Sequence, residues 1–193
     1  YIKKFRGLAG ILTYNSTQRR NIGYLKAAEY GSRVIIILDD DNYISDSKYI
    51  EHIKHVGKNS SFTEVKSSIR WFNPCSMLKT DHGNEIYMRG FPYAKRYIKN
   101  QYSFKKKSGK VVLNMGLWTH NPDVDAVTNL AQPTEITGLK KGTHTLMLGK
   151  GTFMPINTQN TAIATEILPC FYDVMQGYSF KGLKIDRYSD VWA

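Results

Sequence analysis

Apolar positions in the first third of the chain switch between the period of a strand and that of a helix. Residues 8–13 predict a short strand, and residues 18–30 predict a helix that ends at Gly31, a residue that readily stops helices. A second helix is expected at residues 46–56. The buried side of the first helix is expected to carry Ile22, Leu25 and Ala28.

A β-branched run at residues 33–38 is the clearest strand signal. Because it is apolar on both faces, it is typical of a central, parallel strand that is covered on both sides. Three carboxylates follow it at once: Asp39, Asp40 and Asp41. In α/β sheets, ligands bind beyond the carboxyl ends of the strands, so these side chains are expected where a ligand sits.

The remainder of the chain predicts shorter elements. Residues 81–110 are polar, basic and interrupted by Gly and Pro, which indicates mostly loop with short helical pieces. Strands alternating with helices predict an α/β fold, a sheet flanked by helices. No linker divides residues 1–193, so a single domain is expected. Further elements are expected as strands at residues 69–71, 111–118 and 144–148, a loop at 57–61 and a helix at 167–175.

The three adjacent carboxylates are a candidate metal site. Side chains of this kind at a strand end repel one another unless a cation neutralises them. Hard divalent cations bind carboxylate oxygens and leave positions open for phosphate oxygens. Asp39, Asp40 and Asp41 are therefore candidate ligands of a metal that carries a diphosphate. An acidic turn or a helix cap is the alternative, because Asp is common at both.

The charge of the chain favours an anionic partner. There are 27 Lys and Arg residues against 16 Asp and Glu, which gives a net charge of +11. A phosphorylated small molecule, a nucleic acid or a membrane surface would each suit this charge, and a solvated lysine surface is the alternative. The basic residues are scattered apart from Lys105-Lys106-Lys107. No zinc-finger or RNA-binding pattern accompanies them, so no specific nucleic-acid partner is expected.

Cysteine usage and hydropathy bear on the compartment. Cys75 and Cys170 make neither a disulfide framework nor a metal knuckle. No apolar run reaches membrane-spanning length. A cytoplasmic location is expected, or one peripheral to a membrane compartment. Because Tyr1 is not a natural start, the sequence is expected to be a fragment, truncated at both ends.

Two arginines and three aspartates are further candidates for chemistry. Gly90 and Pro92 predict a fixed turn that presents Arg89. Its guanidinium, like that of Arg96, suits the oxygens of a diphosphate. Solvent-exposed arginines and aspartates in turns or caps are the alternative. A carboxylate near a sugar acts as a base or binds hydroxyl groups, which nominates Asp123, Asp125 and Asp190.

Several short segments recur with the order and spacing of a known family. Asn21-Ile22-Gly23-Tyr24-Leu25 is followed by Ile37-Leu38-Asp39-Asp40-Asp41, and then by Arg89-Gly90-Phe91-Pro92-Tyr93 with Arg96. Later segments are residues 116–118 with 122–126, 151–155 with Asn160, and 187–193. The series resembles the reversibly glycosylated polypeptides and UDP-arabinopyranose mutases.

The resemblance implies a GT-A-type fold with a mostly parallel sheet, a UDP-linked sugar as donor, and Mn²⁺ or Mg²⁺ as cofactor. It also implies reversible attachment of the sugar to an arginine, which maps onto Arg89. The implied metal ligands are Asp39, Asp40 and Asp41. The implied donor-binding residues are Arg89, Arg96, Asp40, Trp118 and Asn160, and the implied catalytic residues are Arg89, Asp125 and Asp190.

Three departures from the family pattern bear on mutase activity and sugar identity more than on fold or donor class. Ser189 replaces an acidic residue, Asn42 stands where the family has Cys, and Thr158-Gln159 replaces a small pair. The predicted function is a metal-dependent nucleotide-sugar mutase or glycosyltransferase, and homo- or hetero-oligomeric assembly is left open. A basic nucleic-acid-binding module and a non-catalytic partner subunit of an active paralogue are the alternatives.

Overall fold

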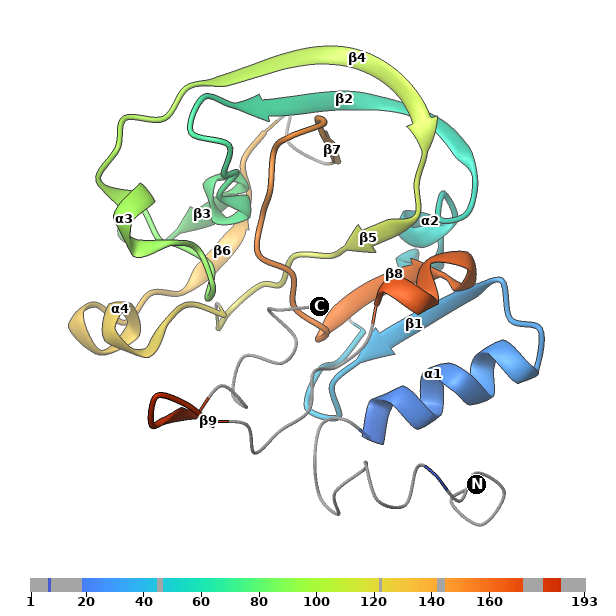
Figure 1. Ribbon diagram of the computed structural model, residues 1–193. Helices are drawn as coiled ribbons and strands as arrows, with labels where there is room; N and C mark the ends of the chain where they lie inside the picture. The colour runs from blue at the N-terminus through green and yellow to red at the C-terminus, as the bar shows by residue number, and fades with distance from the viewer. Residues whose placement is uncertain are drawn as a thin grey trace. The chain divides into compact units, whose positions relative to one another are not determined.

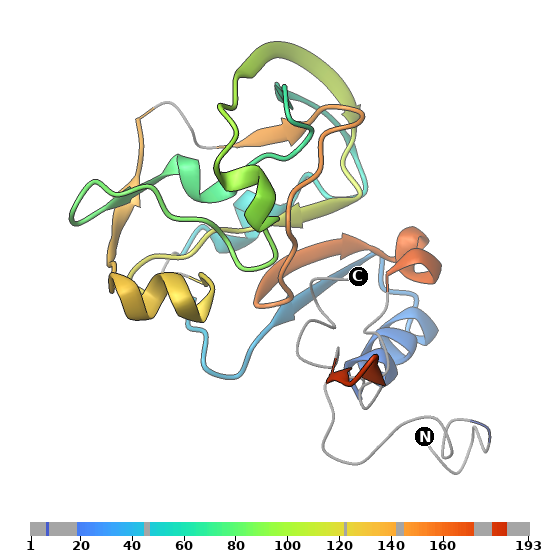
Figure 2. The same ribbon diagram turned by 60° about the vertical axis from the view of Figure 1, so that its left-hand side comes forward.

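The computed structural model describes residues 7, 19–44, 47–121, 123–141, 145–171 and 179–184 (Figures 1 and 2). The chain divides into two compact units, which are described separately. The first takes its described residues from Tyr1–Lys58, Val111–Met115 and Ile156–Ala193, and the second from Asn59–Lys110 and Gly116–Pro155. The single catalytic domain over residues 1–193 stays a prediction.

The first unit is built on a three-stranded sheet of order β1-β8-β5, with β1 at Val34–Leu38, β8 at Asn160–Ala164 and β5 at Leu113–Met115. Both pairings are antiparallel. The strand predicted at residues 33–38 is confirmed, but its placement as a central, parallel strand is wrong, because β1 pairs only with β8 among the described strands. Ile35 and Ile37 are buried while Ile36 and Leu38 are exposed. A β-branched run therefore marked a strand correctly without marking two covered faces.

Helix α1, Arg20–Glu29, confirms the helix predicted at residues 18–30 and lies alongside β1 (Figure 1). Its buried side differs from the prediction, since Leu25 is exposed and Tyr24 is buried. The Tyr24 ring packs at 6.1 Å from the Phe171 ring in a core that also holds Ile35, Ile37 and Ile163. Gly31 ends the helix as predicted, with a positive φ of 71° that favours glycine.

Helix α2, Tyr49–Ile53, is shorter than the predicted span of residues 46–56, and Asp46 lies outside the described residues. Ile53 and Val56 pack with Ala162 and Ala164 of β8 in a second cluster of this unit. The predicted helix at 167–175 is not an α-helix where it is described, because Thr165–Cys170 forms the 3₁₀ helix η4. Two short antiparallel strands, β9 at Ser179–Phe180 and β10 at Leu183–Lys184, follow.

The second unit contains a long pair of antiparallel strands, β2 at Asn59–Ser67 and β4 at Tyr102–Lys110 (Figure 1). Strand β7, Leu146–Leu148, runs parallel to β2 and confirms the strand predicted at residues 144–148 as far as it is described. The predicted loops at residues 57–61 and 81–110 were wrong where β2 and β4 lie. These strands are rich in Ser, Thr and Lys, so their sequence does not show the alternation typical of a strand, although Val65 of β2 is fully buried.

Shorter elements complete the second unit. Strands β3, Leu78–Thr80, and β6, Ile136–Leu139, pair antiparallel. The helices are η3 at Pro74–Met77, α3 at Tyr93–Arg96 and α4 at Ala126–Ala131. The strand predicted at 69–71 is wrong, since Trp71 makes only an isolated bridge to Phe153. The strand predicted at 111–118 is confirmed only over β5.

The fold class is therefore α/β, as predicted, but the expectation of a mostly parallel sheet is wrong for the described strands. Only β2 and β7 run parallel among the described strand pairs, and the other pairings are antiparallel. Within the described residues, no helix has the length and apolar character needed to cross a membrane.

Candidate functional site

The first candidate cluster is the acidic turn, residues 39–42, which follows β1 directly. Its backbone closes through a hydrogen bond from Asn42 N to Asp39 O at 3.2 Å. Asp40 and Asp41 are exposed, whereas Asp39 is partly buried. The guanidinium of Arg20, in the first turn of α1, donates to both Asp39 and Thr158. Asp39 is thus tied to the helix, while the other two carboxylates face solvent.

Polar residues lie just before and at the start of β8, whose Asn160 pairs with Leu38 at the end of β1. Asn157 and Thr158 are almost fully buried, and Asn160, the predicted donor-binding residue, accepts a hydrogen bond from the Tyr49 hydroxyl at 2.9 Å. Neither Arg20 nor Tyr49 was predicted from the sequence as a site residue. Arg20 immediately precedes the Asn21–Leu25 motif, which is the signal that could have drawn attention to it.

The acidic turn fits part of a metal site. Among the described residues, no group of three or more His, Cys, Asp or Glu side chains is arranged to hold a metal ion. Asp39 is already paired with Arg20, so Asp40 and Asp41 are the carboxylates best placed to hold one. Mg²⁺ is commonly held by one or two carboxylates together with phosphate oxygens, and this donor set suits it.

The second candidate cluster is the arginine segment, residues 88–96, in the other unit. Arg89 stands between Met88 and Phe91, which are both almost completely buried. Gly90, with φ of 86°, and a hydrogen bond from Phe91 N to Met88 O at 3.0 Å form the turn that the sequence predicted. Arg89 Nε lies 3.4 Å from Asp123 Oδ1. The turn fixes the backbone of Arg89 while its side chain stays partly exposed.

Arg96, at the end of α3, is more enclosed. Its Nη2 pairs with Asp125 Oδ2 at 2.8 Å, and Nη1 donates to Thr128 Oγ1 at 3.3 Å. The guanidinium lies over the rings of Tyr93, at 4.1 Å, and Tyr87, at 5.1 Å. Only 10% of the Arg96 side chain is exposed, so its role as a diphosphate ligand, which stays a prediction, would require these contacts to change.

Asp125 caps helix α4. It accepts hydrogen bonds from the backbone N of Thr128 at 2.9 Å and from its hydroxyl at 2.6 Å. Burial alone would raise the pKa of Asp125, but the hydrogen bonds from Thr128 and Arg96 outweigh burial and hold this pKa below its usual range. A carboxylate stabilised in this way is a weak proton acceptor. The geometry gives Asp125 a structural role, and its catalytic role stays a prediction.

Cys75 lies close to this network. Burial raises the pKa of its thiol to about 12, and the negative charge of Asp123 adds to the effect while Arg96 opposes it. The thiol therefore stays protonated at neutral pH. Nucleophilic chemistry by Cys75 is accordingly disfavoured, since the thiolate is the reactive form.

Trp118 and Asp190 are the remaining predicted site residues. Trp118 is partly buried in the second unit. Asp190 lies outside the described residues. The acidic turn and Asn160 belong to one unit, and Arg89, Arg96, Trp118 and Asp125 belong to the other. The predicted residues therefore form two clusters, each organised within its own unit.

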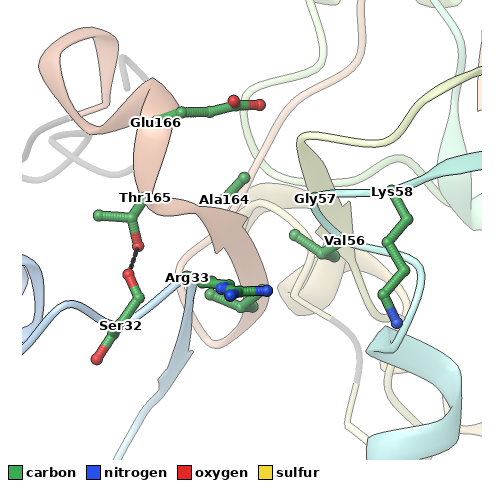
Figure 3. Close-up of a pocket in the computed structure, with 9 residues that line it drawn as sticks. Ser32, Arg33, Val56, Gly57, Lys58, Ala164, Thr165 and Glu166 are labelled. Atoms are coloured by element: carbon green, nitrogen blue, oxygen red, sulfur yellow. Dashed lines mark hydrogen bonds between the residues drawn. The ribbon is translucent and has the colours of Figure 1, made fainter.

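Each unit also has a hollow. In the second unit a cavity of about 450 Å³ adjoins the arginine segment and is lined by Tyr87, Phe91, Lys95, Arg96, Lys99 and Asn100, among others. In the first unit a hollow of about 440 Å³ lies at the start of β1, away from the acidic turn (Figure 3). Arg33, Lys58 and Glu166 line it, and the Thr165 hydroxyl donates to Ser32 O there. None of the predicted site residues lines this hollow of the first unit.

Comparison with known proteins identifies the family. The chain is 24% identical to the probable UDP-arabinopyranose mutase 2 of Solanum tuberosum and to UDP-arabinopyranose mutase 3 of Arabidopsis thaliana, and 23% identical to UDP-arabinopyranose mutase 1 of Oryza sativa subsp. japonica. Each match covers 96% of this chain but 46% of the relative, so the chain spans about half the length of these relatives. Residues 3–193 match the family model described as reversibly glycosylated polypeptide. The chain belongs to the reversibly glycosylated polypeptide family.

Proposed function

We propose that the protein is a UDP-sugar mutase that passes the sugar through Arg89. The observation that carries the proposal is the arginine turn, in which two buried neighbours hold the Arg89 backbone while its guanidinium stays partly exposed beside Asp123. The relatives named UDP-arabinopyranose mutase make a UDP-linked sugar the substrate class. A GT-A-like arrangement of the whole protein belongs to this proposal.

Two chemically distinct roles are open to Arg89 in this reaction. As a carrier, it would take the sugar from the nucleoside diphosphate and return it after rearrangement. As a clamp, it would only stabilise the charge of the diphosphate, which is the role of a guanidinium fork in many phosphate sites. We favour the carrier role, because the Arg89 side chain is partly exposed and open to a ligand. The Arg96 side chain is enclosed by its partners and suits a structural role instead.

The acidic turn would serve the diphosphate. Asp40 and Asp41 would hold a divalent cation, Mn²⁺ or Mg²⁺, which when bound supplies positive charge to the leaving diphosphate. Arg20 would keep Asp39 in place so that the turn retains its shape when the ligand leaves. An ordinary glycosyltransferase with a separate acceptor would use the same turn and is the nearest alternative.

The basic surface supports a small-molecule partner rather than a specific nucleic acid. Two of the three clustered lysines point at a buried carboxylate, with Lys107 Nζ at 2.6 Å and Lys105 Nζ at 3.5 Å from Glu64. The hydrogen bond from Lys107 is the main reason that the pKa of Glu64 is lowered. Glu64 therefore offsets one of the three positive charges of this cluster within the protein. The proposal also includes a cytoplasmic or membrane-peripheral location and homo- or hetero-oligomeric assembly.

Binding and turnover test the proposed function. UDP-, GDP- and TDP-sugars would be compared by thermal shift with Mn²⁺ and with excess chelator, because a ligand that binds the native state raises Tm. We expect a UDP-sugar to stabilise the full protein most, and only with the metal. Incubation with UDP-arabinopyranose should then yield an isomer of the same mass on chromatography. If millimolar donor gives no stabilisation and no isomer, the proposal is refuted.

A further inference from the structure

Asp123 is held opposite Arg89 by the main chain as well as by charge. Met88 and Val124 form an antiparallel bridge, and Arg89 N donates to Asp123 O at 2.9 Å. The two residues therefore face each other whatever their side chains do. Since Met88 is fully buried, this part of the backbone has little freedom to separate them.

The side chains of the pair are unequal in exposure. Arg89 is 30% exposed and Asp123 only 11%, and Arg89 Nε lies 3.4 Å from Asp123 Oδ1. The carboxylate is thus the better covered partner, and it contacts the nitrogen nearest the arginine stem. Because the guanidinium group is planar and rigid, a charge contact on its Nε side favours one orientation of the whole group.

The neighbouring aspartate is engaged elsewhere. Asp125 pairs with Arg96 and caps α4 through Thr128. The two aspartates of one short segment thus serve different arginines, and it is Asp123 that serves Arg89. The sequence favoured Asp125 over Asp123 for a role beside the sugar, and the structure places Asp123 at the residue proposed to react.

We propose that Asp123 is the positioning residue for glycosylation of Arg89, an inference that rests on the proposed carrier function. In that step a guanidinium nitrogen bonds to C1 of the sugar while the bond from C1 to the diphosphate oxygen breaks. The diphosphate departs with the electron pair, and the nitrogen releases one proton to water. Asp123 acts through Arg89, by fixing the guanidinium plane and by offsetting its positive charge.

Charge compensation is needed because glycosyl transfer passes through a transition state with positive charge on the sugar ring. An unpaired guanidinium would repel that charge. A fixed carboxylate behind the guanidinium reduces the repulsion without reorganising during the reaction. A neutral amide at this position would keep the shape of the contact and lose the compensation.

The test measures label transfer from UDP-[¹⁴C]arabinopyranose to the full protein, with the labelled peptide mapped by mass spectrometry. Asp123→Asn is expected to slow labelling of Arg89 by roughly 100-fold, the effect of misplacing a reacting group. The Kd for the donor should change by less than about threefold, because positioning affects the reaction more than ground-state binding. Asp123→Glu, which keeps the charge, should recover part of the lost rate.

Asp81→Asn is the matched control. Asp81 is another aspartate of the same unit, with hydrogen bonds to the backbone of His82 and Glu135, and it is not part of the proposed site. It should label at the wild-type rate. Melting temperatures of all variants separate loss of fold from loss of positioning, because a merely structural Asp123 would lower Tm without a selective loss of rate.

The outcomes separate the inference from the function on which it rests. Wild-type protein that binds donor but takes up no label refutes the carrier function, and the inference with it. If Asp123→Asn is labelled as fast as the wild type, the inference is overturned and the carrier function stands. The same holds if Asp123→Glu is labelled no faster than Asp123→Asn. If Asp123→Asn does not fold, full wild-type labelling by Asp123→Glu would overturn the inference, and slowed labelling at unchanged donor Kd would support it.

Discussion

The acidic turn and the arginine segment carry opposite charges and treat them in opposite ways. In the acidic turn only Asp39 is tied down, by Arg20, while Asp40 and Asp41 face solvent. In the arginine segment each positive charge has a carboxylate partner within the protein: Arg89 pairs with Asp123, and Arg96 pairs with Asp125. Adjacent carboxylates that no protein cation neutralises favour binding of an external cation. Arginines that are paired with carboxylates instead stabilise the local conformation. The two regions therefore suit ligand capture and positioning, respectively.

The largest expected effect is on stability, at the enclosed end of the arginine segment. Arg96→Ala removes a guanidinium that pairs with Asp125 and packs against two tyrosine rings. Breaking one partner of a buried pair leaves the other charge uncompensated, at a cost of about 3 kcal/mol. Urea unfolding at neutral pH measures this change. Lys99→Ala, at an exposed basic position nearby, is the control and should change the free energy of unfolding by less than about 0.5 kcal/mol.

If Arg96→Ala proved as stable as Lys99→Ala, Arg96 would not be a structural residue. The contrast with the acidic turn would then fail, and Arg96 would return to being a candidate for donor binding.

The second prediction concerns metal-dependent donor binding at the acidic turn. Asp40→Asn or Asp41→Asn should weaken UDP-sugar binding in Mn²⁺ by about tenfold or more, because loss of a ligand charge weakens a hard-cation site. Calorimetry with and without excess chelator measures the effect. Wild-type affinity that is unchanged in chelator would rule out a metal at the turn. Asp39→Asn is the comparison, since its partner is Arg20, and it should lower Tm in the absence of any ligand.

The features of these regions that the sequence predicted correctly depend on residues close together in the chain. The helix over residues 18–30, the strand over residues 33–38 and the turn at Gly90 depend on side-chain periodicity and on glycine conformation, which neighbours in the chain determine. The acidic turn was placed correctly for the same reason, because it follows directly after an apolar strand.

What the sequence did not predict depends on contacts between distant segments. The direction of β1 is set by β8, more than 120 positions later, and β2 and β4 are polar strands whose pairing no period reveals. The pairing of Arg96 with Asp125 and of Arg89 with Asp123 joins segments about 30 positions apart. The donor-binding and catalytic roles assigned to these residues came from side-chain chemistry and from family resemblance, and neither of these gives the partners of a side chain.

A third prediction concerns pH. The pKa of Asp125 is lowered in the folded protein, so its contribution to stability is present above its unfolded pKa of about 3.9 and is lost as pH falls toward the folded value. The free energy of unfolding of the wild type should therefore fall as pH drops below about 4. Asp125→Asn should be less stable at pH 7 and should lose less stability over the acidic range. Urea unfolding over a pH series tests this, and parallel curves for the two proteins would contradict it.

The smallest expected effect is on the stability of the acidic turn itself. Asp41→Ala removes an exposed carboxylate that stands next to two others, so the relief of their mutual repulsion offsets any favourable interaction that the side chain makes. The free energy of unfolding in chelator should stay within about 0.5 kcal/mol of the wild type, the usual range for a surface change. Urea unfolding with and without Mn²⁺ checks this, and Mn²⁺ should stabilise the wild type more than the variant. A decrease above about 1 kcal/mol in chelator would show that Asp41 is held by the protein as firmly as Asp125 is. The acidic turn would then be a structural feature like the arginine segment, with no charge left over for a ligand.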